Sequence, residues 1–256
     1  MILVDTHTHL YLEQFDEDRK AIVESAIAQG VKQMLLPNID SHSLEDMKKL
    51  HRDFPSNCFP MIGLHPTSVK DNYEDELTLV ENELRSGNYI AVGEIGIDLY
   101  WDKEHAEQQK DAFRRQLRLA KKYGLPVSIH IRDSFDMAYP IVKEESTDGL
   151  KGIFHCFTGT TSEAKQIMDI GFKMGIGGIV TFKNAGLADI VKAIPDESLV
   201  LETDAPFLTP TPFRGKRNQS AYLKYIAEKL AEIKSKSIDE IAEITTNNAK
   251  DVFPIN

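Results

Sequence analysis

The sequence predicts an α/β protein in which eight strands and their connecting helices form a closed (β/α)8 barrel of the TIM type. Three observations support this fold class: eight apolar, β-branched-rich runs have the length of a strand, segments with helical periodicity separate them, and the alternation fits within 256 residues. Continuous apolar strands joined by helical crossovers are typical of a parallel sheet covered by helices. A doubly wound open sheet is the alternative arrangement.

The predicted elements alternate along the whole chain. The strands are Ile2–Asp5, Gln33–Pro37, Cys58–Gly63, Ile90–Glu94, Val127–Ile131, Gly152–Cys156, Phe172–Gly177 and Leu199–Asp204. The helices between them are Asp16–Gln29, Ser43–Arg52, Tyr73–Glu83, Glu104–Tyr123, Ser134–Glu145, Ser162–Ile170 and Leu187–Ala193. Two further helices, Ala221–Glu232 and Ile238–Asn247, have no strand after them, so we expect them to close the bottom or the side of the barrel. Because no linker or repeat interrupts the pattern, we expect a single domain over residues 1–256.

Composition and charge exclude several classes of function. A net charge of −10 argues against broad adhesion to nucleic acid or to an anionic membrane, since those surfaces bind basic proteins. The two cysteines, Cys58 and Cys156, are too few and too far apart for a disulfide framework. The chain shows no secretory signal and no apolar run long enough to span a bilayer. We therefore expect a cytoplasmic protein with no membrane partner and no obligate protein partner.

The run Asp5-Thr6-His7-Thr8-His9 directly follows the first apolar stretch. Because side chains alternate along a strand, a two-residue offset places both imidazoles on one face, where they can bind one metal ion. Taken alone, the pair could equally be two surface histidines on a polar strand face. The other residues of the same kind decide between these interpretations.

Six side chains able to bind metal fall at or near the C-terminal ends of predicted strands. They are His7 and His9 after the first strand, Glu94 ending the fourth, His130 in the fifth, His155 in the sixth and Asp204 ending the eighth. In a barrel these ends converge on one mouth, so we expect one site at the C-terminal mouth that holds two divalent ions. Glu94 is the natural bridge, because a carboxylate can offer one oxygen to each ion and an imidazole serves only one.

Each of these residues also has a simpler interpretation. A single histidine such as His130 or His155 is more often a hydrogen-bonded core or rim residue. Glu94 could cap the following helix, and Asp204 could be a turn acid before proline. These interpretations fail jointly, because so many unpaired titratable groups near one core would be costly. His65, in Gly63-Leu64-His65-Pro66, lies at the same mouth, and we interpret it as a substrate contact.

With these residues identified, the chain resembles the TatD family of metal-dependent deoxyribonucleases, a branch of the amidohydrolase-type barrels. The resemblance runs from end to end, in the motifs Asp5–Leu10, Gly63–Pro66, Gly93–Asp98, Pro126–His130, His155–Gly159 and Glu202–Leu208. It implies that His7, His9 and Glu94 hold one ion, with Asp204 close by. It implies that Glu94, His130 and His155 hold the second. Related amidohydrolases often bridge their metals with a carbamylated lysine, a modification that Glu94 makes unnecessary here.

One segment departs from the family pattern, which continues with an Arg-Gly segment and an Asn-x-Pro. Here Phe213–Ser220 contains Arg214-Gly215 and Asn218 but lacks the proline. We expect Asn218 still to anchor the loop. The change affects the rigidity of the loop and leaves the predicted metal ligands in place.

The resemblance implies hydrolysis of phosphodiester bonds in DNA. In the expected reaction water attacks phosphorus in line, Asp204 accepts its proton as general base, and the two ions, held by Glu94, carry the developing charge. The ligand types fit magnesium, manganese or zinc. Because a mouth that holds metals is narrow, we expect an exonuclease that acts on single strands or frayed ends.

Local positive charge and aromatic rings near the mouth are the candidate substrate contacts. Arg132 follows the fifth strand, and Arg214 and Arg217 lie in the loop after Asp204, so all three could contact phosphates. Trp101, shortly after Glu94, could stack on an exposed base. The predicted substrate site therefore consists of His65, Trp101, Arg132, Arg214 and Arg217.

Other functions remain open at this stage. The same ligands could hydrolyse a small amide, ester or lactone, or the ester bond of an aminoacyl-tRNA. A third interpretation is a nucleic-acid-associated protein with a structural metal. A phosphodiesterase should lose activity steeply with salt and on removal of Arg214 or Arg217, whereas a small-amide hydrolase should not. The binding protein should bind metal without turnover.

Overall fold

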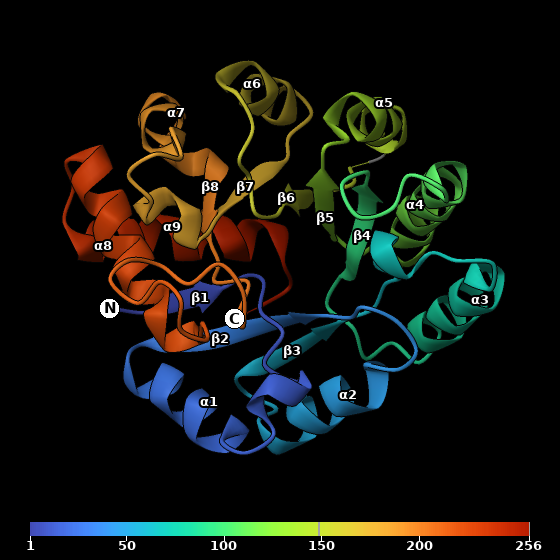
Figure 1. The fold of residues 1–256 in the computed structure, drawn as a ribbon, viewed down its shortest axis with the longest axis horizontal. Helices are drawn as coiled ribbons and strands as arrows, with labels where there is room; N and C mark the ends of the chain where they lie inside the picture. Colours follow the sequence, from blue (N-terminus) through green and yellow to red (C-terminus); the bar gives the residue numbers. More distant parts are fainter. Residues whose placement is uncertain (148, 256) are drawn as a thin grey trace.

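A computed structural model describes residues 1–147 and 149–255 and confirms the predicted (β/α)8 barrel, with its strands enclosed by helices (Figure 1). The strands are β1 (Leu3–Asp5), β2 (Val31–Pro37), β3 (Cys58–Met61), β4 (Val92–Asp98), β5 (Val127–Arg132), β6 (Gly152–Phe154), β7 (Lys173–Ile176) and β8 (Leu199–Leu201). The helices are α1 (Arg19–Ala28), α2 (Leu44–Asp53), α3 (Tyr73–Leu84), α4 (Ala106–Tyr123), α5 (Phe135–Glu145), α6 (Thr161–Asp169), α7 (Leu187–Ala193), α8 (Leu223–Lys234) and α9 (Ile238–Val252). Short 3-10 turns lie at Glu13–Phe15, Pro66–Ser68, Gly178–Thr181, Asp196–Ser198 and Ser220–Tyr222.

The strands pair in parallel and in chain order, and two seams close the ring. β1 to β3 form one ladder and β4 to β8 form the other. Ile62 N donates to Ala91 O (3.2 Å) and Gly93 N donates to Ile62 O (2.9 Å), which joins the segment after β3 to β4. Thr6 N donates to Leu201 O (3.0 Å), which joins β1 to β8. The sheet is therefore a closed barrel, and the open-sheet alternative is wrong.

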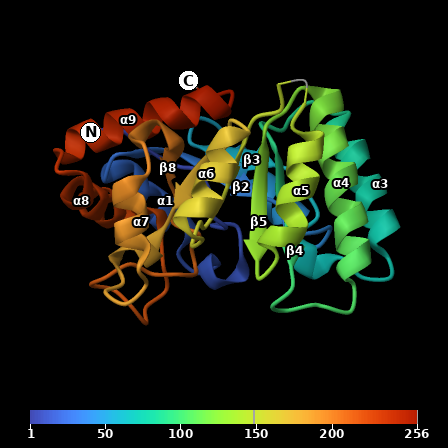
Figure 2. The same cartoon turned by 90° about the horizontal axis from the view of Figure 1, so that it is seen from above.

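The terminal helices close the barrel as predicted, and α9 covers its N-terminal end. Figure 2 shows α9 lying across one end of the barrel, on the same side as both chain termini. Thr246 Oγ1 donates to Ile2 O (3.1 Å), and Asn248 Nδ2 donates to Leu199 O (2.8 Å), so the helix binds the starts of β1 and β8. Apolar side chains of the strands pack against Phe253 beneath it. The opposite end, where the strands finish, is left for the functional site.

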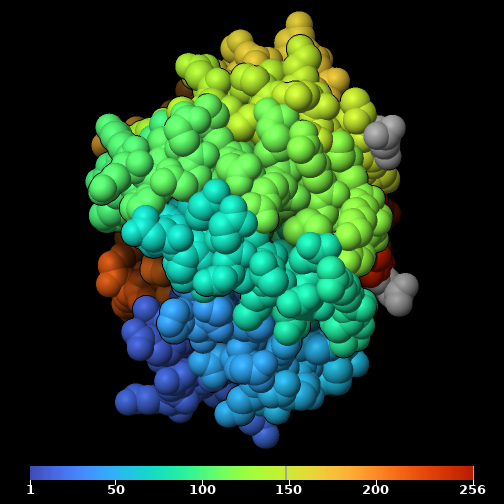
Figure 3. Space-filling view, turned by 90° about the vertical axis from the view of Figure 1, so that its right-hand side faces the viewer, coloured from blue at the N-terminus to red at the C-terminus, as the bar shows by residue number. Residues whose placement is uncertain are grey.

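The helices that cover the wall begin and end at recognisable signals. α6 and α9 begin with capping boxes, Thr160 with Glu163 and Ser237 with Glu240. α4 ends at Gly124, whose φ of 65° lies in the left-handed region that favours glycine. In side view, the cyan and green segments that include α3 to α5 cover this face of the barrel (Figure 3). None of the helices in the described ranges is long and apolar enough to cross a bilayer.

The predicted end of the fourth strand is wrong, because Glu94 does not end β4. The sixth and eighth strands are shorter than predicted, so His155 and Asp204 follow β6 and β8, and α9 continues past the predicted Asn247 to Val252. β4 continues to Asp98 and pairs with β5 through Gly96↔His130. A side chain at Gly96 would place its Cβ 1.9 Å from His130 O, so the glycine permits the close approach of the two strands. Glu94 and Asp98 therefore both face the interior, one deep and one near the mouth.

Candidate metal centre

The four imidazoles and two carboxylates predicted as metal ligands meet at the C-terminal end of the barrel, and His65, predicted as a substrate contact, lies beside them. His7 and His9 follow β1 in a segment that bends at Thr6 and His7 and that backbone bonds hold on both sides. Thr8 N donates to Leu35 O (3.1 Å) in β2, and Asp204 N donates to His7 O (2.9 Å) beyond β8. His7 Nε2 and His9 Nε2 both lie against Glu94, so the two imidazoles point inward together, as the sequence predicts, although the segment that carries them is not regular strand.

Glu94 lies at the centre of the cluster and is almost fully buried. Its Oε2 lies 3.1 Å from His7 Nε2 and 3.4 Å from His9 Nε2. Its Oε1 lies 2.8 Å from His130 Nδ1 and 2.7 Å from His155 Nε2. The two oxygens of one carboxylate thus face two separate pairs of imidazoles.

Two of these histidines have their other ring nitrogen bound to a hydrogen-bond acceptor. Tyr11 OH donates to Pro37 O (2.5 Å), so its oxygen is left to accept from His9 Nδ1 at 2.9 Å. Asp98 Oδ2 accepts from His130 Nε2 at 3.0 Å. These bonds hold a proton on the outer nitrogen, so His9 Nε2 and His130 Nδ1 face the centre, where each can offer its lone pair to a metal ion.

Glu202 lies behind His155 and places a negative charge near its outer nitrogen without a hydrogen bond to it. Its Oε1 lies 3.7 Å from His155 Nδ1 and accepts from Cys156 N at 2.5 Å. The carboxylate is fully buried beside Gly175, where an added Cβ would lie 2.0 Å from Glu202 Oε2. Only glycine leaves room for this acid, so β7 and β8 together hold it behind His155.

The centre is arranged to keep its acids ionised. Burial opposes ionisation of Glu94, but the surrounding imidazoles, His155 first, hold the pKa of this carboxyl well below its usual range. The pKa of Asp204 is also lowered against the effect of burial, chiefly by its contact with His9. Burial and the neighbouring His155 lower the pKa of His7, which favours its neutral, metal-binding form.

The residues present fit divalent metal ions. His7 Nε2 and His9 Nε2 lie only 3.3 Å apart and both lie against Glu94, an arrangement that a cation between them would satisfy. The cluster contains three sets of three residues whose ligand atoms lie within 4.8 Å of one another. They are His7 with His9 and Glu94, His7 with His155 and Asp204, and His65 with Glu94 and His130. Nitrogen and carboxylate donors of this kind suit zinc, manganese or iron, and the carboxylates also admit magnesium.

Asp204 faces the same centre from a constrained loop. Its Oδ1 lies 3.5 Å from His9 Nε2 and 3.9 Å from His7 Nε2. Its φ of 54° is left-handed, a conformation that needs external support. Asn218 gives that support, because its side-chain amide donates to Thr203 O (2.8 Å) and Phe207 O (2.6 Å). Asn218 therefore anchors this loop as predicted, without the proline of the family pattern.

His65 lies nearer the metal centre than the sequence indicates, yet its protonation favours a hydrogen-bond donor. Thr67 N donates to His65 Nδ1 (3.1 Å), so that nitrogen carries the lone pair and Nε2 carries the proton. His65 Nε2 lies 3.2 Å from Glu94 Oε1. A donor N–H at this position can stabilise an anion, which agrees with the predicted role as a substrate contact.

The rim of the mouth carries the predicted aromatic and cationic side chains. Trp101 is 68% exposed and packs edge-on against Tyr100, with ring centroids 4.9 Å apart. The Arg132 guanidinium stacks over Tyr100 at 3.9 Å and lies 5.4 Å from the Trp101 ring. Arg214 stacks over Phe182 at 3.9 Å in a different sector of the rim. Trp101, Arg132 and Arg214 are therefore solvent-accessible for contact with a substrate.

Arg217 has structural partners instead. Its guanidinium pairs with Asp18 at 2.5 Å, hydrogen-bonds Gln14 O and lies 4.6 Å from the Phe15 ring. These contacts fasten the loop after β8 to the segment before α1. Because Asp18 already pairs with this charge, the structure does not support the phosphate contact at Arg217, which stays a prediction.

Three residues of the centre do not follow from the sequence reasoning, namely Tyr11, Asp98 and Glu202. Asp98 and Glu202 lie in the Gly93–Asp98 and Glu202–Leu208 motifs, which by themselves give these two acids no function. The available signal was alternation: Asp98 lies four residues after Glu94, and Glu202 two residues before Asp204, on the same face of the chain.

A (β/α)8 barrel whose mouth gathers imidazoles around a buried carboxylate defines the class of metal-dependent hydrolases. Residues 4–254 match the family model described as TatD related DNase. The chain belongs to this family, as the sequence motifs indicate.

Several relatives agree with this assignment over their full length. The chain is 41% identical to an uncharacterized metal-dependent hydrolase, YabD of Bacillus subtilis, over 100% of both chains. It is 33% identical to the 3'-5' ssDNA/RNA exonuclease TatD of a Rahnella species, over 97% of each. The crystal structure of YjjV, a TatD homologue from Escherichia coli, superposes with a TM-score of 0.93 at 29% identity and covers 99% of this chain and 98% of that one.

Replacing Glu202 with glutamine tests its support of His155. The amide removes the negative charge behind the His155 ring. It presents to Cys156 N and His155 Nδ1 either its oxygen, a weaker acceptor than a carboxylate, or its NH2 group, a donor. We therefore expect the ring to lose its orientation. We expect metal affinity to fall by about ten- to hundredfold, measured by titration calorimetry. The exposed Glu197→Gln variant is the matched control and should bind metal normally; equal affinity in both variants would remove Glu202 from the centre.

Proposed function

We propose that this protein is a nuclease that uses two divalent ions to hydrolyse phosphodiester bonds of DNA, as an exonuclease on single strands or frayed ends. The observation that carries the proposal is the division of Glu94 between two imidazole pairs, one at each of its oxygens. His7 and His9 would hold one ion with Asp204 close by, and His130 and His155 would hold the other. Glu94 would bridge them.

The side chains of the centre divide the chemistry between them. When bound, the ions supply Lewis acidity toward the phosphate and the attacking water. Asp204 is the carboxylate with more solvent access, its side chain being 14% exposed against 3% for Glu94. Asp204 Oδ1 therefore accepts the proton of the attacking water. The Nε2–H of His65 donates toward charge that develops on phosphate oxygens.

The rim supports a nucleic-acid substrate in a protein of net charge −10. Arg132 and Arg214 lie in different sectors of the rim and can contact successive phosphates, while the exposed face of Trp101 can stack on a base. Stacking and phosphate contacts tolerate any sequence, which suits an exonuclease. The Rahnella relative, named for single-stranded DNA and RNA, supports the same substrate class.

The test is metal-dependent release of mononucleotides from end-labelled single-stranded DNA, with matched single-stranded RNA and a blunt duplex. We expect release from the single strands and little from the duplex, and none after chelation of the metal. A small-amide or ester hydrolase would leave all three polymers intact but cleave a chromogenic ester, and an aminoacyl-tRNA hydrolase would deacylate charged tRNA only. A binding protein with a structural metal would bind the labelled strand without turnover.

The two accessible rim arginines should determine the salt dependence. Replacing Arg132 or Arg214 with alanine removes one phosphate contact, so the slope of log binding constant against log salt should fall by about 0.7 for a single strand. Arg217→Ala is the matched comparison, because Arg217 already pairs with Asp18, and its slope should match the wild type. Fluorescence anisotropy with a labelled oligonucleotide at several salt concentrations measures this; a change at Arg217 alone would reverse our assignment.

A further inference from the structure

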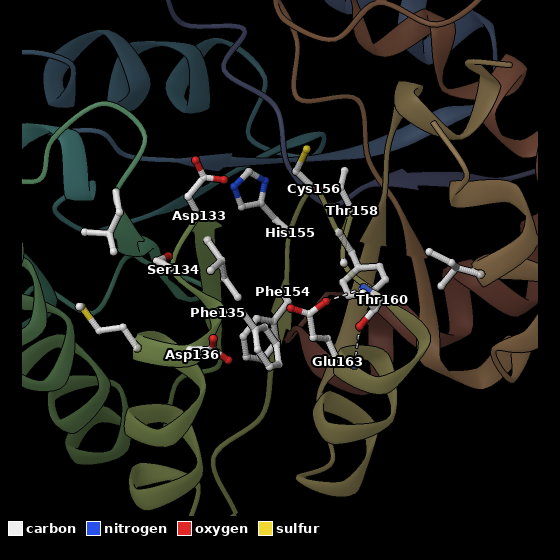
Figure 4. Close-up of a pocket in the computed structure, with 16 residues that line it drawn as sticks. Asp133, Ser134, Phe135, Asp136, Phe154, His155, Cys156, Thr158, Thr160 and Glu163 are labelled. Atoms are coloured by element: carbon white, nitrogen blue, oxygen red, sulfur yellow. Dashed lines mark hydrogen bonds between the residues drawn. The ribbon is translucent and has the colours of Figure 1, made fainter. Parts of the chain in front are cut away.

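A cavity of about 660 Å³ opens beside the metal centre, between the segments that follow β5 and β6. Figure 4 shows its lining, with Asp133, Ser134 and Asp136 on the side of α5 and Thr158, Thr160 and Glu163 on the side of α6. His155 and Cys156 form part of the same wall. Because His155 Nε2 also lies 2.7 Å from Glu94, the cavity and the metal centre share a wall. A substrate group next to a phosphate held at the centre can therefore occupy this cavity.

The side chains that line this cavity determine which chemical groups of a substrate it can bind. The half-buried Phe135 contributes aromatic surface, on which a nucleobase can stack, and the buried Phe157 adds apolar lining. Asp133, Asp136 and Glu163 contribute carboxylates, and the described part of the lining contains no lysine or arginine. Such a wall accepts hydrogen bonds from hydroxyl or amino groups and repels a phosphate.

Two of the three carboxylates are available for a ligand. Glu163 Oε2 already accepts from Thr160 N at 2.5 Å in the capping box of α6. Within residues 1–147 and 149–255, the side chains of Asp133 and Asp136 have neither a hydrogen bond nor an ion pair. The neighbouring Arg132 does not neutralise them, since its guanidinium stacks over Tyr100. The cavity thus presents two unpaired acceptors beside an aromatic wall.

We infer that this cavity holds the terminal nucleoside of the strand and that Asp133 and Asp136 select an end with a free hydroxyl over one with a phosphate. The inference rests on the proposed nuclease function and specifies which end that function accepts. When the scissile phosphate lies at the metal centre, one sugar separates this phosphate from the terminal hydroxyl. The carboxylates can accept a hydrogen bond from that hydroxyl. An end phosphate, or a chain that continues past this position, would bring a second negative charge against the same carboxylates. The lining therefore favours removal of single terminal nucleotides over internal cleavage.

The test compares two otherwise identical single-stranded oligonucleotides, one ending in a 3′-hydroxyl and one in a 3′-phosphate. With the metal-loaded enzyme, we expect kcat/KM for the hydroxyl end to exceed that for the phosphate end by about tenfold or more. In the double variant Asp133→Asn with Asp136→Asn, the phosphate-ended strand should be cut faster and the ratio should fall to about two or less. Asparagine also tolerates the left-handed φ of 54° at position 133, so the loop should keep its conformation.

The control is Asp169→Asn, an exposed acid at the far end of α6, which should keep the wild-type ratio. Equal cutting of both ends by the wild type, or an unchanged ratio in the double variant, would overturn the inference and leave the nuclease function standing. Cutting of neither strand by the wild type would reject the nuclease function, and this inference with it. Inhibition by thymidine 5′-monophosphate but not by thymidine 3′,5′-bisphosphate is the expected binding result, and equal inhibition by the two would contradict it.

Discussion

Replacing Glu94 with alanine is expected to lower the rate of metal-dependent hydrolysis by about a thousandfold or more, because one side chain faces both imidazole pairs. Glu94 contributes an oxygen at 3.1 Å from His7 and another at 2.7 Å from His155, so one side chain contacts both pairs directly. Its loss would leave neighbouring imidazoles without the anion that holds them together. Single-turnover cleavage of labelled single-stranded DNA with saturating metal measures the effect.

Two further variants separate chemistry from folding. Glu94→Gln keeps the shape of the side chain but removes its charge and one of its two acceptor oxygens, so it should also be strongly impaired while retaining the thermal stability of the fold without metal. Glu104→Ala, an exposed position between β4 and α4, should behave as the wild type. Activity of Glu94→Ala within about tenfold of the wild type would be inconsistent with a bridging role.

Replacing Asp204 with asparagine is expected to lower kcat by about a hundred- to ten-thousandfold, the usual contribution of a general base. Asparagine is the conservative choice, because it tolerates the left-handed φ of 54° and has nearly the same size as aspartate. The amide can still lie near His9 but cannot take up a proton from the attacking water. We therefore expect a large loss in kcat with a much smaller change in KM, measured by steady-state kinetics.

The control for this prediction is Asp53→Asn, an exposed acid at the end of α2, which should leave kcat unchanged. Metal titration of Asp204→Asn gives a second readout. A full complement of metal with lost turnover would support proton transfer at Asp204. Unimpaired turnover would show that another group accepts the proton.

Much of the fold can be predicted from the sequence, because the periodicity of apolar residues and the lengths of the apolar runs are local signals of strands and helices. All eight strands and nine helices lie where the pattern predicts them, and α7 has the predicted bounds, Leu187–Ala193. The error that bears on the site concerns β4, whose predicted end is Glu94. The strand continues because Gly96 permits the close approach of β5, and that approach is a tertiary contact that no local pattern reports.

The candidate site could be predicted only in part, for the same reason. His7 and His9 were placed by strand alternation, and the others by their positions near strand ends. The proton positions on His9 and His130 were not predictable, because they depend on hydrogen bonds to the side chains of Tyr11 and Asp98 that form only in the folded barrel. The ion pair between Arg217 and Asp18 was not predictable either, because Asp18 lies 199 residues away in the sequence.

The central claim is that Glu94 holds two divalent ions between the two imidazole pairs, and the most direct test is the metal content of the purified protein. Equilibrium dialysis against manganese or zinc, followed by elemental analysis, gives the number of ions bound per chain. We expect two ions per chain in the wild type and one or none in Glu94→Ala. Saturation of a fully active wild type at one ion per chain, or unchanged binding of two ions by Glu94→Ala, would contradict the account.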